Sequence, residues 1–216
     1  MFFCYGEKEK DYLRRKDKRM SVVIERVGDI CREVDSDLFS SLIHHIVGQQ
    51  ISTKAQATIW QRFVDEFGAI EPSAIAAAEL ERIQKLGVSF RKASYIQDCA
   101  ARVESGEFDL SAVQEMSDDD AVKQLITLKG IGVWTAEMIL LFCLQRPNVF
   151  SFDDLAIHRG LRMLYRHRAI DRTLFEKYRR RFSPYCSVAS LYLWAVAGGT
   201  LPELTDCGGS SKKKRA

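Results

Sequence analysis

Helical periodicity is the feature that most restricts the fold of this 216-residue chain. Apolar side chains recur three or four positions apart through most of its length, as in Leu38, Leu42 and Ile46. No segment longer than a few residues alternates apolar and polar positions as a half-buried strand does. The pattern predicts an all-α protein of two lobes, with about ten helices joined by short turns.

Several signals predict where helices begin and end. Gly68 is expected to end a helix that starts near residue 53, while Pro72 and Gly87 are expected to bracket a single helix. Ser117, followed by Asp120, predicts a capped helix start with two further aspartates in the first turn. Helical patterns also cover residues 37–52, 91–106, 118–128, 134–145, 154–165, 171–182 and 187–198.

Composition and cysteine spacing argue against several classes of protein. No apolar run approaches the ~20 residues of a membrane-spanning helix, and charges occupy the N-terminus where a signal peptide has its apolar stretch. We therefore expect a soluble, intracellular protein. The six cysteines are widely spaced without a CxxC pair, which argues against a zinc site or a four-cysteine iron–sulfur cluster. Reduced thiols are expected, with Cys99 and Cys143 in the core.

The net charge of +3 is distributed unevenly. Residues 21–157 carry 12 Lys or Arg against 21 Asp or Glu, whereas residues 158–181 carry nine against two. This dense basic segment, which includes Arg159, Arg162 and Arg166, suggests that a polyanion binds on one face, although basic helices that are merely solvated are about as common. The run from Lys212 to Arg215 is assigned to a disordered basic tail, 207–216.

Two glycines around one apolar residue, Gly130-Ile131-Gly132, predict a tight hairpin. A helix ending in ITLKG stops here, and a second helix begins at once with Trp134. Free backbone N–H groups at the start of that helix, together with its dipole, suit a phosphate oxygen. Many helical hairpins use glycine only to turn, so the motif alone is weak support for phosphate binding.

Two aspartates, Asp153 and Asp154, open a helix directly before the basic segment. Negative charge is favoured at the start of a helix, and such a carboxylate could steady a developing cation or orient a water. The alternative is that both aspartates only cap the helix. This alternative is favoured for Asp153, because a capping side chain stands just before the first turn.

These motifs resemble those of the helix-hairpin-helix DNA glycosylases, most closely the bacterial 3-methyladenine-DNA glycosylase II group. The resemblance rests on LKGIGVWTAEMI (128–139), its spacing to FDDLAI (152–157), and SPYCSVASLYLW (183–194), and it extends over roughly residues 35–200. It implies a two-lobed helical fold with a DNA-binding cleft between the lobes, and Asp154 as the catalytic residue. It also implies that the hairpin grips the DNA backbone through Lys129, Gly130, Ile131, Gly132, Trp134 and Thr135.

Position 134 bears on the reaction type. Bifunctional members of the family have a nucleophilic lysine two residues after the second hairpin glycine, where this chain has Trp134. Lys129 lies before the turn, in place of a usual proline, and is poorly positioned to act instead. The resemblance therefore implies monofunctional hydrolysis without a Schiff base.

The resemblance implies roles for four further side chains. IVGQQISTKA (46–55) resembles the loop that fills the gap left by an extruded base, with Gln50 as the wedge and Gln49 beside it. Trp194, together with Trp134 and Met138, is similar to the lining of the base pocket, where an indole can stack on a cationic alkylpurine. The residues alone leave three alternatives. Gln49 and Gln50 could be a polar pair that ends a helix, Trp194 a core tryptophan, and Met138 a core methionine.

Three further features are interpreted as structural or as departures from the family. Trp60 is expected in the core, and the four histidines are expected at the surface or as caps, without metal ligation. Cys186 stands where relatives often have an arginine. Only Cys186 and Cys207 follow Asp154, so the C-terminal iron–sulfur cluster of some relatives is not expected.

These observations together predict a monofunctional DNA N-glycosylase that excises alkylated purines, chiefly 3-methyladenine, with 7-methylguanine as a second substrate. The lobes are expected at 35–147 and at 1–34 with 148–206, and Arg159 and Arg162 are expected to contact phosphate. The expected partner is double-stranded DNA containing a damaged base, bound by a monomer in the cytoplasm of a bacterium, at its nucleoid. No cofactor is expected apart from a K⁺ or Na⁺ ion at the carbonyls of Leu128 and Ile131.

Two alternatives remain open. The first is a glycosylase for an oxidised or deaminated base, since lesion selectivity depends on pocket shape and on how easily a base is extruded. The second is a noncatalytic helix-hairpin-helix DNA-binding protein. Asp154 argues against the second alternative, because a carboxylate close to DNA repels phosphate and would serve a pure binder poorly.

Overall fold

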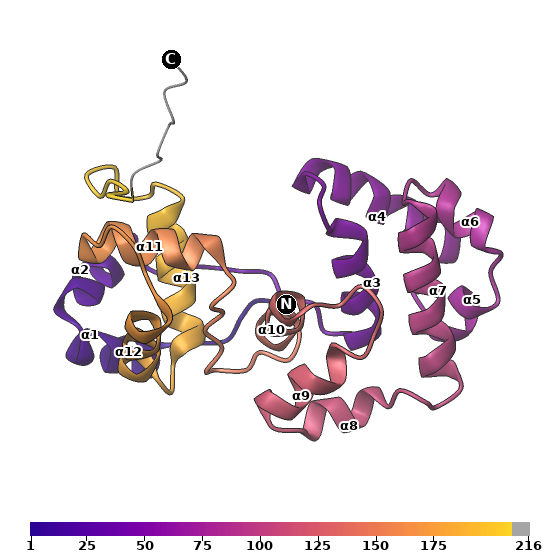
Figure 1. Ribbon diagram of the computed structural model, residues 1–216, viewed down its shortest axis with the longest axis horizontal. Coiled ribbons are helices and arrows are strands. Elements are labelled where there is room, and N and C mark those ends of the chain that lie inside the picture. Colours follow the sequence, from indigo (N-terminus) through magenta and orange to yellow (C-terminus); the bar gives the residue numbers. More distant parts are fainter. Residues whose placement is uncertain (209–216) are drawn as a thin grey trace, which may run out of the picture. The chain divides into compact units, whose positions relative to one another are not determined.

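The computed structural model describes residues 1–208, and helices form nearly all of their regular secondary structure (Figure 1). Within that range the only strand-like pairing is one antiparallel bridge between Phe2 and Glu33. The all-α class is therefore confirmed, with more helices than expected. They are α1 (Glu7–Lys16), α2 (Lys18–Val27), α3 (Leu38–Gly48), α4 (Thr53–Phe67), α5 (Pro72–Ala76), α6 (Leu80–Lys85), α7 (Phe90–Glu104), α8 (Leu110–Glu115), α9 (Asp118–Leu125), α10 (Val133–Phe142), α11 (Leu155–Tyr165), α12 (Arg172–Phe182) and α13 (Cys186–Ala197).

The chain divides into two units. Unit 1 comprises Met1 and Val34–Leu144, and unit 2 comprises Phe2–Glu33 and Gln145–Ala216. The sequence predicted lobes of 35–147 and of 1–34 with 148–206. The predicted basic tail falls mostly on residues 209–216, which lie outside the described residues. None of the helices within residues 1–208 has the length and apolar character needed to cross a bilayer.

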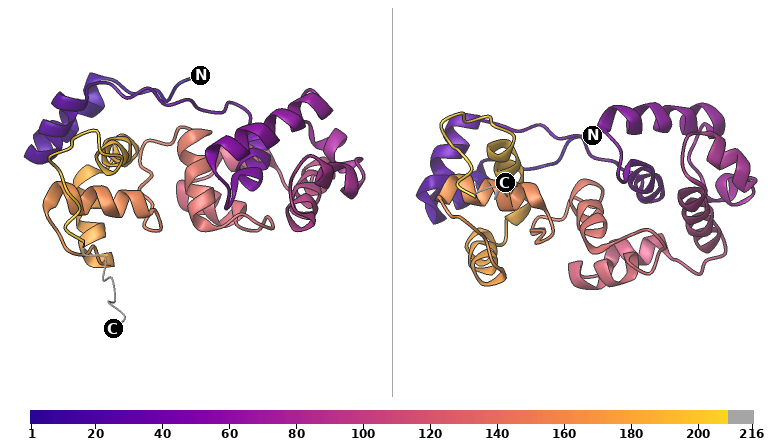
Figure 2. Two further views of the ribbon diagram at one scale, coloured as in Figure 1. Left: turned by 90° about the horizontal axis from the view of Figure 1, so that it is seen from above. Right: turned by 45° about the horizontal axis from the view of Figure 1, so that its top comes forward.

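The N-terminal helices α1 and α2 belong to unit 2, although they precede unit 1 in the chain. The segment before α1 and the segment after α2 run side by side, as Figure 2 shows, with the Phe3 N–H donating to the Arg32 carbonyl at 2.8 Å. This hydrogen bond joins the two ends of the segment that contains α1 and α2. The two helices pack against the C-terminal helices α11, α12 and α13 of the same unit.

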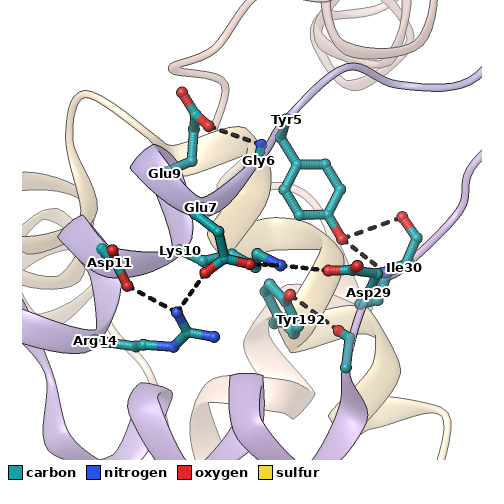
Figure 3. A network of polar contacts seen from close by, with 11 residues as sticks. Tyr5, Gly6, Glu7, Glu9, Lys10, Asp11, Arg14, Asp29, Ile30 and Tyr192 are labelled. Atoms are coloured by element: carbon teal, nitrogen blue, oxygen red, sulfur yellow. Dashed lines mark hydrogen bonds and ion pairs between the residues drawn. The ribbon is translucent and has the colours of Figure 1, made fainter.

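A buried polar network attaches α1 to the rest of unit 2 (Figure 3). Lys10 is only 6% exposed, and its Nζ lies 2.5 Å from carboxylate oxygens of both Glu7 and Asp29. The Tyr192 hydroxyl of α13 donates to the Gly28 carbonyl at 3.0 Å. The Lys10 ion pair with Asp29 joins α1 to the turn after α2, and the Tyr192 hydrogen bond joins that turn to α13.

Unit 1 is built around α3, in which Leu38, Leu42 and Ile46 are fully or almost fully buried, as the periodicity predicted. Helix α7 packs against α3, α5 and α6. In α4 only Phe63 is buried, and Trp60 remains half-buried beside His44. The expectation that Trp60 is a core residue is therefore wrong, because α4 contributes one narrow apolar edge to this unit.

Several helix boundaries agree with the sequence. Gly68 follows α4 with a φ of 66°, and the Ser117 side chain caps α9 by accepting the N–H of Asp120. Residues 72–87 are not one helix, however. They form α5 and α6, separated by Glu79 in an extended conformation, which allows both Ile75 and Ile83 to be fully buried.

The helix before the hairpin also ends earlier than expected. Helix α9 stops at Leu125, and the N–H groups of Thr127 and Leu128 bond three residues back, at 3.1 Å each. Residues 126–130 are therefore tight turns and not a continuation of α9. The sequence patterns did not predict α1, α2 or α8. Helix α8 has only six residues, and α1 and α2 bury only a few of their ten residues each.

Candidate functional site

Asp154 is the N-cap residue of α11 and is only 6% exposed. Its Oδ1 accepts the backbone N–H of Ile157 at 2.8 Å and the indole N–H of Trp194 at 3.1 Å. The first bond satisfies a helix-start donor that would otherwise be unpaired. The second joins the carboxylate to α13, so Asp154 is held in one orientation by two helices.

Close packing of α11 on α13 places these two side chains together. A Cβ at Gly160 would lie 3.0 Å from the carbonyl carbon of Leu193 and closer still to its oxygen. Only glycine permits this approach without displacing the neighbouring backbone. Because Trp194 follows Leu193, the same contact sets its half-buried indole beside Asp154.

Two serines of α13 contact the backbone of residues 146–149, the segment that precedes Asp154 in the chain. The Ser187 hydroxyl donates to the Arg146 carbonyl at 2.5 Å and accepts the Val149 N–H at 3.0 Å. The Ser190 hydroxyl lies 2.9 Å from the Cys186 carbonyl, one turn earlier in α13, and 3.3 Å from the Val149 carbonyl. Both serines are fully buried, and the sequence reading missed them. Their spacing of three on an otherwise apolar helix was the available signal.

The two aspartates have different surroundings from those expected. Asp153 was favoured as the capping residue, but Asp154 makes the capping bond and Asp153 is exposed in the preceding turn. The helix begins one residue later than that interpretation required. Capping and a chemical role are therefore compatible in the same carboxylate.

The predicted hairpin lies in unit 1 and depends on Gly130. This residue has a φ of 86°, and a Cβ on it would lie 2.5 Å from Cδ2 of Tyr95. Gly132 is the N-cap of α10, and no side chain caps that helix start. Trp134 is 42% exposed at the beginning of α10, whereas Thr135 is 6% exposed.

The predicted wedge loop is bonded to the hairpin. Gln49 donates from Nε2 to the Gly130 carbonyl at 2.6 Å, and Lys92 donates to the carbonyls of Val47 and Gln49 at 2.8 and 2.6 Å. Gln50 is exposed and has a φ of 58°, a left-handed conformation that is uncommon outside glycine. The structure therefore brings Gln49 to the hairpin and leaves the Gln50 side chain projecting from the loop.

A pocket of about 460 Å³ adjoins both features within unit 1. Its lining includes Gln50, Trp134 and Thr135, and also two residues that the sequence reading missed, His45 and Gln56. Burial lowers the pKa of His45 to about 4, and its Nδ1 lies 3.0 Å from the Ser41 carbonyl. The expectation of a surface or capping role is wrong for His45, which is a neutral wall of this pocket at pH 7.

Helix α7 supports the hairpin through one face that the sequence reading also missed. Lys92, Tyr95 and Asp98 follow one another at intervals of three, which places them on the same side of the helix. Lys92 bonds the wedge loop, the Tyr95 ring packs on Gly130, and Asp98 accepts a 2.6 Å bond from Lys129. Lys129 is thus anchored to α7.

The remaining predicted residues differ in their accessibility. Met138 is 3% exposed, as expected of a core residue in unit 1. Arg159 is half-exposed, with its Nε 3.9 Å from Asp206. Arg162 forms two hydrogen bonds with Asp206, at 2.8 and 2.6 Å, and lowers the pKa of that carboxyl. Arg166 lies at the C-terminal end of α11, opposite the Asp154 end.

The cysteines behave as structural residues where their surroundings are described. Cys99 and Cys143 are buried, as expected, and burial raises the pKa of each thiol to about 12. Cys186 is also fully buried, and its thiol donates to the Arg179 carbonyl at 3.3 Å. The Cys186 side chain therefore packs between α12 and α13.

The proposed cation position consists of backbone carbonyls in a turn. The Leu128 carbonyl accepts the Ile131 N–H at 3.1 Å, which leaves its second lone pair. Leu128 and Ile131 are both buried residues of this turn. Hard oxygen donors of this kind fit K⁺ or Na⁺.

Comparisons with known proteins agree with these motifs. A Bacillus subtilis relative, provisionally named a DNA-3-methyladenine glycosylase, is 30% identical over 81% of this chain, and the chain spans 64% of that relative's length. The structure resembles a DNA-3-methyladenine glycosidase from Bacillus halodurans, with 32% identity, a TM-score of 0.83, and coverage of 94% and 95% of the two chains. It also resembles the Schizosaccharomyces pombe 3-methyladenine DNA glycosylase Mag1 in complex with abasic DNA, with 26% identity, a TM-score of 0.78, and coverage of 92% and 99%.

The family profile described as "HhH-GPD superfamily base excision DNA repair protein" matches residues 43–184. That range contains the wedge loop, the hairpin and Asp154. The chain is therefore a member of the HhH-GPD superfamily of base excision DNA repair proteins.

Proposed function

We propose that this protein is a monofunctional DNA N-glycosylase that excises alkylated purines, chiefly 3-methyladenine, in base excision repair. Family membership and the names of its relatives support the reaction class. The observation that carries the assignment is the buried Asp154 carboxylate, held by the N–H groups of Ile157 and Trp194.

Asp154 would act on the sugar of the damaged nucleotide. Alkylation at N3 or N7 gives the base a positive charge, so it is already a good leaving group and needs little acid assistance. Its departure leaves an oxocarbenium-like sugar, which a preoriented carboxylate stabilises. The same carboxylate would position a water on C1′, and the products are the free base and an abasic site.

Trp134 supports hydrolysis in preference to Schiff-base chemistry. An indole cannot form the covalent amine adduct that strand-cleaving relatives use at this position. Lys129, the nearest lysine in the hairpin, is paired with Asp98. The protein would therefore release the base without cutting the strand.

Several side chains would bind and open the duplex. The hairpin from Lys129 to Thr135 would hold a phosphate on the uncapped start of α10, and exposed Arg159 would contact another. Gln50 would enter the stack that the flipped nucleotide leaves, with Gln49 behind it. Trp194 and Trp134 would offer aromatic faces to the cationic base, and Met138, four residues after Trp134 on α10, would be a further lining residue.

The carbonyls of Leu128 and Ile131 would hold a K⁺ or Na⁺ ion. Such an ion would add positive charge at a backbone turn that approaches phosphate. Binding of DNA by the hairpin would then be stronger in K⁺ than in a bulky organic cation at the same ionic strength.

The decisive experiment measures base release from methylated duplex DNA by the wild type, Asp154→Asn and Asp153→Asn. Asparagine caps helices about as well as aspartate, so Asp154→Asn removes the charge while preserving the cap. We expect the wild type and Asp153→Asn to release 3-methyladenine. Asp154→Asn should bind the DNA but release no 3-methyladenine. Chromatography of the freed bases also shows whether 7-methylguanine is a substrate.

Other outcomes would replace this assignment with one of two alternatives. Release of oxidised or deaminated bases instead would retain the enzyme class and change the lesion. Tight binding without release of any base would identify a noncatalytic DNA-binding protein. A covalent adduct trapped by borohydride with the wild type would refute the monofunctional mechanism.

A further inference from the structure

A second pocket, of about 300 Å³, lies within unit 2 and is formed by α2, the end of α11 and the segment after α13. Leu164 belongs to the C-terminal end of α11, so the pocket is at the opposite end of that helix from Asp154. Its floor is almost entirely apolar and consists of Val22, Val23, Leu164, Leu201 and Leu204. Val22 is 50% exposed, so part of this apolar floor is open to solvent.

The rim of this pocket carries a surplus of positive charge. Four cations surround the floor against a single carboxylate, that of Glu203, which pairs with Arg26. Arg19 donates to the Leu164 carbonyl at 3.0 Å. Within residues 1–208, neither Lys18 nor Arg166 has an ion-pair partner. The rim therefore complements a ligand that brings its own carboxylates.

Arg166 adopts an unusual backbone conformation at this rim. As the C-cap of α11 it has φ 59° and ψ 40°, in the left-handed region where glycine is the usual residue. An arginine there destabilises the turn, because its Cβ crowds the adjacent carbonyl. The helix end therefore holds a long cation at the rim of the pocket, at a backbone position where glycine is the usual residue.

From these observations we propose that the pocket docks a short acidic segment of a partner protein. One apolar side chain of that segment occupies the floor over Val22, and flanking carboxylates pair with Lys18 and Arg166. Duplex DNA matches the charge of the rim but offers no flexible apolar group for the floor. The chain's own basic run, 212–215, has the same sign as the rim and is therefore not a suitable occupant.

A selection from random twelve-residue peptides displayed on phage tests this site with the full-length chain. The expected peptides have one leucine or aromatic residue flanked by aspartate or glutamate. Val22→Glu should abolish their enrichment, because it places a carboxylate on the exposed floor. Val64→Glu is the matched control, since Val64 is 36% exposed on α4 of unit 1 and should leave the enrichment unchanged. Absence of such peptides, or equal enrichment on Val22→Glu, would overturn the proposal.

Arg166→Gly tests the rim without disturbing the fold, because glycine suits the left-handed backbone. We expect this variant to bind a fluorescein-labelled selected peptide about tenfold more weakly, a change of about 1.4 kcal/mol. Arg168→Gly, two residues further on and outside the pocket, should retain peptide binding. If Arg166→Gly instead weakened binding of a DNA duplex and left peptide binding intact, the rim would belong to a nucleic-acid surface and the proposal would be wrong.

Discussion

The Asp154 carboxylate caps α11 and is also the group to which we assign the proposed chemistry. Its Oδ1 accepts hydrogen bonds from the Ile157 backbone and from the Trp194 indole. Because hydrogen bonds are directional, these two donors together restrict the orientation of the carboxylate. Trp194 is therefore expected to affect the rate of base release even where it does not touch the base.

Trp194→Phe should slow single-turnover base release by about tenfold and leave DNA affinity nearly unchanged. Phenylalanine keeps an aromatic face for stacking but removes the donor that orients Asp154. Trp60→Phe is a matched control, because Trp60 packs beside His44 in unit 1. Equal rates for the wild type and Trp194→Phe would show that this hydrogen bond does not assist the reaction.

His45 is expected to make unit 1 sensitive to acid. Burial lowers its pKa to about 4, whereas an unfolded histidine titrates near 6.5. Between pH 6.5 and pH 4 the unfolded chain binds more protons at this histidine than the folded protein does. The free energy of unfolding therefore decreases as the pH falls through this range. The loss from this residue is about 3 kcal/mol when titration is complete.

Urea unfolding of the wild type and His45→Gln at pH 7.5 and pH 4.5 measures this contribution. The variant should lose less stability than the wild type over the same interval, because glutamine does not titrate. His44 shifts in the same direction and remains in both proteins. An identical pH dependence in the two proteins would mean that His45 takes up its proton without cost in the folded state.

Among the elements, α7 and the hairpin form one assembly. Lys92, Tyr95 and Asp98 project from one face of α7 and contact the wedge loop, Gly130 and Lys129 respectively. A segment that binds phosphate with its backbone needs this support, because glycine-containing turns are intrinsically mobile. Helix α7 therefore supports the hairpin on the Gly130 side.

Gly130→Ala should lower the free energy of unfolding by about 1 to 3 kcal/mol, because its left-handed φ and the Tyr95 ring leave no room for a Cβ. Gly132→Ala should change stability by less than about 0.5 kcal/mol, since its φ is −94° and its Cβ position is open. DNA affinity should nevertheless fall in Gly132→Ala if a phosphate approaches that backbone. Denaturation and DNA-binding titrations of both variants separate the two effects, and equal destabilisation would contradict the assignment.

Across the whole molecule, charge is divided between the two units. Unit 1 has nine Lys or Arg against sixteen Asp or Glu, a net charge of −7, and unit 2 has 23 against 13, a net charge of +10. Phosphate attraction is therefore expected to come mainly from unit 2, with the hairpin of unit 1 contributing backbone donors.

Arg159→Gln should reduce the slope of log affinity for duplex DNA against log salt by about 1, as expected when one phosphate contact is lost. Arg159 is suited to this role because its side chain is 54% exposed. Arg162 is paired with Asp206. Replacement of Arg162 should therefore change the stability of unit 2 more than it changes the slope of log affinity against log salt. Lys85→Gln, on α6 of unit 1, is the control for loss of one charge. An unchanged slope for Arg159→Gln would place that arginine away from DNA.

Local sequence alone determined the helical class and most helix limits. The Leu38, Leu42 and Ile46 stripe, the Ser117 cap and Gly68 each depend on neighbours within four residues, which is the range of helix periodicity and capping. The same locality explains the errors at 72–87 and at ITLKG. There, burial of Ile75 and Ile83 and the tight turn after Leu125 overrode a plausible helical pattern. The resemblance of the motifs to a known family supplied Asp154, Gln50 and the hairpin as candidates.

Tertiary structure alone decided which of these residues meet. Trp194 reaches Asp154 from 40 residues away because Gly160 lets α11 and α13 pack closely, and Gln49 reaches Gly130 from 81 residues away. His45, Lys92 and the Arg162–Asp206 pair likewise acquire their surroundings from distant segments. Such contacts depend on how whole apolar faces are buried against one another, and no local pattern of residues encodes that choice.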